Sequence, residues 1–194
     1  MISEETSTPK DGEQANSNPS SKAVALPPYQ PPSIWWDVLS LFIKVIVISL
    51  VFIGVFTFIY GFHRNNEQGM SPTIRDGDLV LFNRRDTNFD PGDLLLLDFQ
   101  GQRQVRRVIA LPGDVVDITE TGLFINGSRQ HEPYIFQETW QFEYGITFPI
   151  TVPPGQVFVL GDARESSTDS RIYGTINTSD TLGKAIAVLR RRGL

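Results

Sequence analysis

The chain has 194 residues, of which 40% are hydrophobic, so it is long enough for one domain with a sizeable buried core. Its net charge of −5 and the lack of a long basic stretch in the folded part exclude the usual electrostatic surface for nucleic acid. Cysteine is absent and there are only two histidines, His63 and His131, so we expect neither a metal site nor a cofactor.

Residues 1–33 are rich in Ser, Pro, Glu, Asn and Gln and contain almost no aromatic side chains. Such a composition cannot bury enough apolar surface to offset the entropy of the chain, which predicts a disordered tail. Its proline-rich stretch, residues 27–32, is compatible with polyproline II structure. We interpret it as a spacer in preference to a ligand for a small domain.

The next segment, residues 34–63, is predicted to be one transmembrane helix. Residues 45–62 are apolar without a single charge. At about 1.5 Å per residue, the apolar stretch spans a hydrocarbon core of roughly 30 Å. Trp35, Trp36 and Tyr60 suit the two membrane interfaces. A cleavable secretory signal is disfavoured because a long polar tail precedes the segment.

Residues 64–194 form short β-rich runs separated by Gly, Pro and Asp, and they predict an all-β domain with a Greek-key-like or partly closed sheet arrangement. The fold class is therefore mainly β, after a disordered tail and one transmembrane helix. Residues 130–149 carry aromatic side chains without a clean period, which fits either an irregular excursion packed on the core or a surface for lipid headgroups. The predicted strands are residues 79–82, 94–99, 104–110, 115–118, 123–125, 157–160 and 184–189.

Three separated motifs carry the chemical information. Residues 69–74 read Gly-Met-Ser-Pro-Thr-Ile, residues 106–114 read Arg-Arg-Val-Ile-Ala-Leu-Pro-Gly-Asp, and residues 161–171 read Gly-Asp-Ala-Arg-Glu-Ser-Ser-Thr-Asp-Ser-Arg. In this order and spacing, the chain resembles the bacterial type I signal peptidases, which are membrane peptidases with a Ser/Lys dyad. The resemblance covers about residues 38–188 and implies a signal-peptidase-like β domain.

Both dyad positions of the family are substituted in this chain. The family has a serine before the methionine of the first motif and a lysine six residues before the proline of the second, and here these positions hold Gly69 and Arg106. Lysine acts as a base because burial lowers its pKa, whereas a guanidinium stays protonated up to a pKa of roughly 12. Glycine offers no nucleophile. The resemblance therefore implies a divergent, catalytically impaired homologue.

Ser71 is an alternative nucleophile. If two residues were deleted just before Pro72, Gly69-Met70-Ser71 would match a Gly-x-Ser pattern of the family and the hydroxyl would be restored. The base would still be missing, and a residue before proline has a restricted backbone. We favour a serine that bonds its neighbouring backbone at a turn, and we assign Met70 to the supporting residues.

In the family, a serine and an aspartate of the third motif brace the lysine, and the corresponding residues here are Ser167 and Asp169. Arg171 stands beside them, while Ala163 replaces an asparagine of the family pattern. Buried charges must be paired, so we interpret this motif chiefly as architecture. We also predict a salt bridge from Arg106 to Asp169 or to another nearby acid.

The resemblance further implies a single-pass protein of the bacterial plasma membrane, with a cytoplasmic N-terminus and an extracytoplasmic β domain. The charges that flank the predicted helix hardly decide the orientation. Expected partners are the lipid membrane and exported preproteins or signal peptides, which the family binds by strand addition. The predicted function is binding of such peptides without cleavage. The alternatives are an active signal peptidase that uses Ser71 and a scaffold subunit that binds no peptide.

Overall fold

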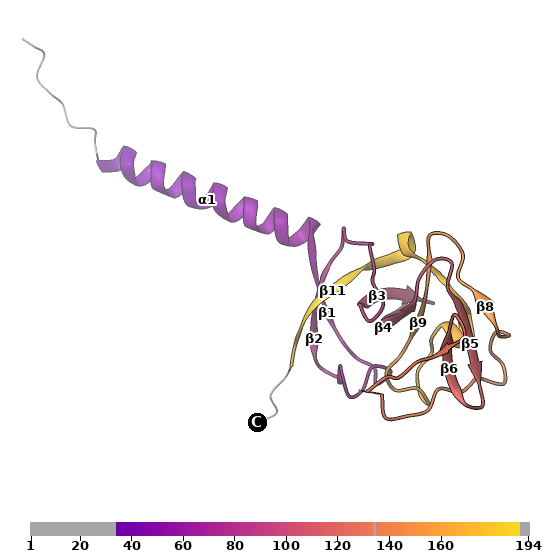
Figure 1. Ribbon diagram of the computed structural model, residues 1–194. Coiled ribbons are helices and arrows are strands. Elements are labelled where there is room, and N and C mark those ends of the chain that lie inside the picture. The colour runs from indigo at the N-terminus through magenta and orange to yellow at the C-terminus, as the bar shows by residue number, and fades with distance from the viewer. Residues whose placement is uncertain (1–33, 134, 191–194) are drawn as a thin grey trace, which may run out of the picture. The chain divides into compact units, whose positions relative to one another are not determined.

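The computed structural model describes residues 34–133 and 135–190 (Figure 1). The predicted disordered tail, residues 1–33, lies outside the described residues. Helix α1 (Ile34–Phe58) is 25 residues long and buries none of its side chains. At 1.5 Å per residue it is about 37 Å long. It is long and apolar enough to cross a membrane.

The helix ends earlier than the sequence predicts, at Phe58 instead of residue 63. The chain turns into strand β1 (Tyr60–Arg64), which pairs antiparallel with strand β2 (Leu79–Asn83). The close approach of the two strands depends on Gly61, because a Cβ atom there would lie 2.3 Å from the ring of Phe82. Strand pairing therefore outcompetes continuation of the apolar helix.

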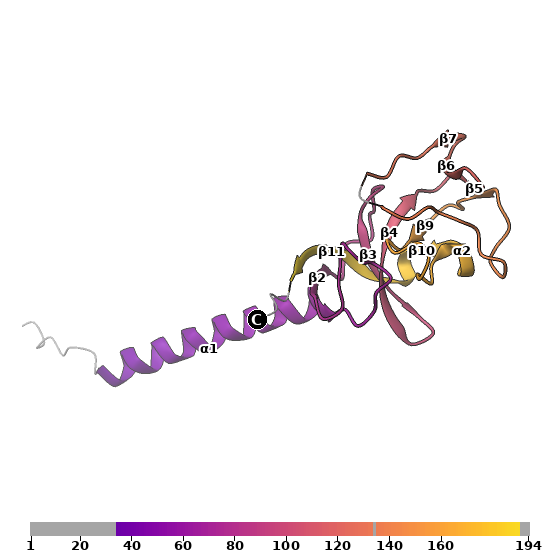
Figure 2. The same ribbon diagram turned by 90° about the horizontal axis from the view of Figure 1, so that it is seen from below.

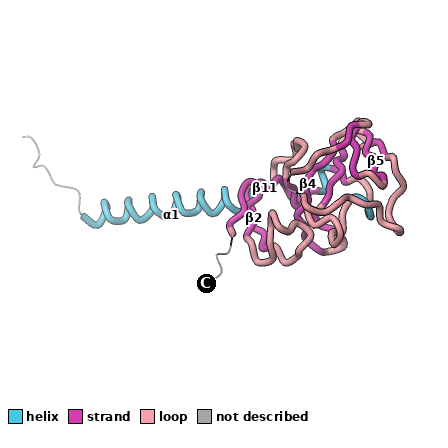
Figure 3. The backbone as a smooth tube through the Cα atoms, turned by 60° about the horizontal axis from the view of Figure 1, so that its bottom comes forward, coloured by secondary structure: helices cyan, strands magenta, loops and turns pink. Residues whose placement is uncertain are grey.

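The rest of the described chain is organised in two antiparallel sheets with two short helical segments (Figure 3). The larger sheet has seven strands in the order β1-β2-β11-β3-β4-β9-β10, and the smaller has four in the order β7-β6-β5-β8. Figure 2 shows β5, β6 and β7 gathered at one end of the β domain and β2 and β11 at the other. The remaining elements are β3 (Leu94–Phe99), β4 (Gln102–Ala110), β5 (Val115–Thr119), β6 (Gly122–Ile125), β7 (Ser128–Arg129), β8 (Ile150–Thr151), β9 (Gln156–Leu160), α2 (Ser170–Tyr173), β10 (Ile176–Asn177), the 3₁₀ helix η1 (Thr178–Asp180) and β11 (Thr181–Leu189).

The mainly β fold class is confirmed, and each of the seven predicted strands overlaps an observed one. The strands that the sequence does not reveal are β1, inside the predicted helix, and the two-residue strands β7, β8 and β10. Two residues are too few to show an alternating pattern. The described residues of 130–149 form neither helix nor strand, as the lack of a clean period indicates.

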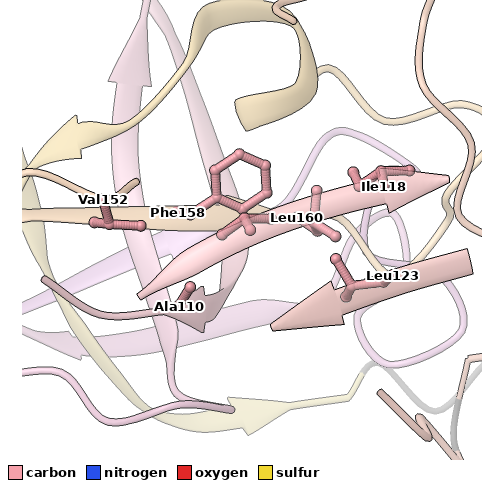
Figure 4. Packing of buried hydrophobic residues seen from close by; sticks show 7 residues of the cluster. Ala110, Ile118, Leu123, Val152, Phe158 and Leu160 are labelled. Atoms are coloured by element: carbon pink, nitrogen blue, oxygen red, sulfur yellow. The ribbon is translucent and has the colours of Figure 1, made fainter. Parts of the chain in front are cut away.

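The core consists of three clusters of buried apolar side chains. One joins the two sheets and contains Ala110, Ile118, Leu123, Phe158 and Leu160 among its members (Figure 4). A second lies under β2, β3 and β4 and includes Met70 of the first motif, which is fully buried. Met70 thus anchors the loop that carries Gly69 onto the core.

Candidate functional site

The three sequence motifs converge at one place in the β domain. The carbonyl oxygen of Gly69 accepts a hydrogen bond from the amide of Ala163 at 3.0 Å, which joins the first motif to the third. A Cβ atom at Gly69 would lie 3.2 Å from both terminal nitrogens of Arg106, which joins the first motif to the second. A Cβ atom at Gly161 would lie 2.0 Å from Ser167 Oγ, so only glycine permits this packing.

Arg106, on β4, is 1% exposed, and all its guanidinium nitrogens donate hydrogen bonds. Nη1 and Nη2 each donate to one carboxylate oxygen of Glu67, the second at 3.0 Å. Further acceptors are Gln104 Oε1 at 3.0 Å, the carbonyl of Thr168 at 2.9 Å and the carbonyl of Val105 at 2.5 Å. Such a bidentate pair fixes the guanidinium in its plane. Arg106 thereby ties β4 to the loops on both sides of the site.

The predicted salt bridge of Arg106 therefore exists, but its partner is Glu67 and not Asp169. Asp169 instead pairs with Arg171, with Arg171 Nη2 at 2.8 Å from Asp169 Oδ2 and both side chains buried. Arg171 satisfies the carboxylate of Asp169, so this carboxylate is not available to Arg106. A buried cation still requires a counter-charge, and Glu67 supplies it from two residues before Gly69.

The guanidinium of Arg106 lies close to the position that a side chain at residue 69 would take. Gly69 does not have a left-handed backbone, so its φ angle does not require glycine. At 3.2 Å from the guanidinium nitrogens, however, an added Cβ atom would be in a tighter contact than most carbon atoms make. Gly69 and Arg106 are thus complementary in volume, because the guanidinium packs closely against a residue without a side chain.

Ser71 lines a pocket and is not among the residues to which Arg106 donates hydrogen bonds. Its backbone amide donates to the carbonyl of Gln68 at 2.9 Å in a turn, and the expected bond from the serine hydroxyl to the backbone stays a prediction. Its pocket, which we call the Ser71 pocket, has a volume of about 310 Å³. Neither lysine nor histidine occurs among the described residues that line it, and its carboxylate, Asp162, is ion-paired with Arg107 at 2.6 Å. The lining residues are Gln68, Ser71, Pro72, Phe136, Gln137, Asp162, Ala163 and Ser166.

Other titratable groups do not provide the missing base. Lys184 Nζ lies 2.5 Å from Asp93, and its hydrogen bond to that carboxylate raises the pKa of Lys184, which keeps the amine charged. Burial raises the pKa of Tyr173, and the positive charge of Arg106 opposes this shift only in part. Both groups are therefore protonated at neutral pH.

The third motif forms a buried polar network. Asp169 accepts hydrogen bonds from the amide of Gly161 at 3.1 Å and from Arg171 Nε at 2.9 Å, and it caps the N-terminus of α2. Ser167 Oγ is buried and has no hydrogen-bond partner among the described residues. The family's bracing serine and aspartate are thus in place next to Gly69, but they contact no amine.

Two arginines of the same motif hold residues 130–149 against the domain. Arg164, fully buried, lies 2.5 Å from a carboxylate oxygen of Glu132. Arg171 donates to the carbonyl of Trp140 at 3.1 Å. These contacts favour the interpretation of residues 130–149 as an irregular excursion packed on the core.

Sequence reasoning did not single out Glu67, Gln104 or Arg164 as site residues. Glu67 could have been found from the sequence. A buried arginine in a motif requires a carboxylate partner, and Glu67 lies only two residues before Gly69. Gln104 and Arg164 carry no such signal, because their roles depend on contacts between segments far apart in the chain.

Comparison with known proteins agrees with the motif pattern. The family model described as signal peptidase, peptidase S26, matches residues 37–190. Signal peptidase I of Bacillus amyloliquefaciens is 31% identical over 138 residues, which cover 66% of this chain and 75% of the relative. Signal peptidase I S of Bacillus subtilis is 32% identical over 139 residues, with 66% and 76% covered.

Among solved structures, the crystal structure of a signal peptidase I from Enterococcus faecalis V583 is similar, with a TM-score of 0.42 and 30% identity. The likeness covers 50% of this chain and 96% of that one. The family match spans most of the chain, and the chain covers three quarters of the B. amyloliquefaciens relative at over 30% identity. The chain therefore belongs to the signal peptidase I family, peptidase S26.

Proposed function

We propose that this membrane-anchored member of the signal peptidase family binds exported proteins or their signal peptides without cleaving them through a Ser/Lys dyad. The observation that supports the proposal is the Arg106 guanidinium, buried against Gly69 and paired with both oxygens of Glu67. An arginine–carboxylate ion pair then stands where the family has the hydroxyl and the amine of its dyad.

Acyl transfer by a Ser/Lys dyad needs a hydroxyl, a neutral amine and hydrogen-bond donors for the developing oxyanion. Gly69 has no hydroxyl, and a Cβ atom there would lie 3.2 Å from the guanidinium nitrogens of Arg106. A guanidinium does not lose its proton at neutral pH, and a bidentate carboxylate stabilises the charged form further. The site thus lacks both the nucleophile and the base.

Peptide binding does not depend on the dyad, because strand addition uses backbone hydrogen bonds and shallow side-chain pockets. The Ser71 pocket remains open next to the converging motifs, and small side chains such as Ser71, Ala163 and Ser166 line it. We further propose that the protein resides in the bacterial plasma membrane, with a cytoplasmic N-terminus and the β domain outside.

The proposal is tested with the full-length protein in lipid nanodiscs and a preprotein whose signal peptide carries a photo-crosslinker before its cleavage site. We expect crosslinks to residues of the Ser71 pocket and an intact preprotein. Cleavage of the preprotein by the unmodified protein would overturn the proposal in favour of an active peptidase if Ser71→Ala abolishes it. The control variant Ser179→Ala, in η1, should then preserve the cleavage. Absence of both crosslinks and cleavage would instead favour a scaffold that binds no peptide.

A further inference from the structure

The Ser71 pocket adjoins a second pocket, which is lined by three arginines. Pro72 and Phe136 line both pockets. The second, which we call the arginine pocket, has a volume of about 440 Å³ and is also lined by Thr73, Arg75, Arg107 and Arg190. An extended segment that occupies the Ser71 pocket can therefore reach the arginine pocket without leaving the surface.

Among the described residues, two of these three arginines take part in none of the ion pairs. Arg107 is neutralised by Asp162, which it contacts through Nε at 2.8 Å and Nη2 at 2.6 Å. Arg75 and Arg190 are exposed, and neither takes part in an ion pair among the described residues. The described lining of the arginine pocket thus contains three arginines and no acidic residue, in a molecule whose overall net charge is negative.

The two residues that line both pockets, Pro72 and Phe136, are apolar. The Phe136 side chain is 83% exposed. Its ring and the Pro72 ring offer apolar contact to an uncharged part of a ligand, while the guanidinium groups offer planar pairs of donors that match a carboxylate. Apolar contact followed by cationic donors suits a peptide with an acidic side chain.

We propose that the arginine pocket selects peptides with an aspartate or glutamate a short distance along the chain from the segment held in the Ser71 pocket. Arg75 and Arg190 are the specificity-determining residues, and Arg107, held by Asp162, shapes the pocket floor. This inference rests on the proposed function, because it names the class of peptide that the same groove retains.

The test measures fluorescence anisotropy of labelled peptides with the full-length protein in nanodiscs made of zwitterionic lipid. A neutral alanine-containing signal-peptide sequence is compared with variants in which one aspartate is moved along the chain. We expect a gain in affinity of about tenfold at one or two adjacent positions, the size of a hydrogen bond to a charged group. The gain should disappear in Arg75→Gln and Arg190→Gln and persist in Arg129→Gln, a matched loss of one exposed charge on β7.

Binding of the neutral peptide without any gain from aspartate would overturn this inference and leave the proposed function standing, whereas no binding of any peptide would overturn both. An equal loss in Arg129→Gln would also overturn it, because the effect would then come from overall charge. The same variants are tested on phosphatidylglycerol vesicles. A loss of vesicle binding alone would assign the arginines to lipid headgroups and contradict the proposal. Unchanged thermal unfolding of the variants excludes misfolding as the cause.

Discussion

Arg106 differs from a lysine at the same position in more than its pKa. It donates to acceptors in three segments: Glu67 before the first motif, Gln104 and Val105 on β4, and Thr168 in the third motif. An ammonium group has three donors and no planar fork, so it cannot reproduce this set. The substitution therefore adds cross-links at the centre of the site in addition to removing the base.

Glu67 is expected to block simple restoration of the dyad. In the double variant Gly69→Ser/Arg106→Lys, the carboxylate would stabilise the charged form of the new lysine and raise its pKa. We expect weak preprotein cleavage from the double variant at neutral pH and clearly faster cleavage after Glu67→Gln is added. The pH at which kcat/KM is half-maximal should fall with that third change.

Equal rates of preprotein cleavage in the double and triple variants at every pH would show that Glu67 does not raise the pKa of the introduced lysine. Cleavage in neither variant would indicate that the groove has changed beyond these three positions. Gln68→Asn in the double variant serves as the control for a conservative change in the same loop.

His63, on β1, gives the stability a predictable dependence on pH. Burial, followed by the positive charge of Arg103, lowers the pKa of His63 from 6.5, while Glu67 acts in the opposite direction. Between the lowered folded value and 6.5, the unfolded chain binds more protons, so stability is full above 6.5 and is lost as the pH falls through that window. Urea unfolding between pH 7.5 and 5 should show this decline, and His63→Gln should flatten it. An unchanged slope in the variant would contradict this assignment.

At the scale of elements, the third motif acts as a clamp between the sheets and the irregular segment 130–149. Its buried Asp169–Arg171 pair contacts the backbone of Gly161 on one side and of Trp140 on the other. The conformation of residues 130–149 depends on the Asp169–Arg171 pair, because removal of one partner leaves an unpaired charge inside the protein.

Asp169→Asn is therefore expected to lower the free energy of unfolding by about 3–5 kcal/mol, the usual cost of breaking a buried pair. Amide hydrogen exchange should become faster in residues 130–149. The matched control is Asp93→Asn, which removes the partly exposed Lys184–Asp93 pair and should cost at most about 1 kcal/mol. Equal effects of the two variants would contradict the clamp.

The longer elements could be predicted from the sequence because their patterns are local. Runs such as Leu94–Phe99 are bounded by turn residues and are strongly apolar. The end of α1 could not be placed, because residues 60–62 continue the apolar run and become part of strand β1 only through pairing with β2. The Arg106–Glu67 pair could be anticipated only as some nearby acid, since its geometry depends on how a loop packs against β4.

At the scale of the whole molecule, α1 is an anchor with no polar face: its described side chains are exposed, and its charged residues are Asp37 and Lys44. Arginine near the centre of such a helix costs roughly 3 kcal/mol in membrane insertion. We expect Val47→Arg combined with Leu50→Arg to move much of the protein out of the carbonate-washed membrane fraction. Ile186→Arg, an exposed apolar position on β11, should leave the fractionation unchanged.

The Arg106–Glu67 pair beside Gly69 also has a consequence for how a Ser/Lys dyad could be introduced into this protein. A serine gained first is crowded by the guanidinium, a lysine gained first is held charged, and loss of the carboxylate first leaves a buried cation unmatched. We therefore expect each single change toward a Ser/Lys dyad to be unfavourable when it is made alone.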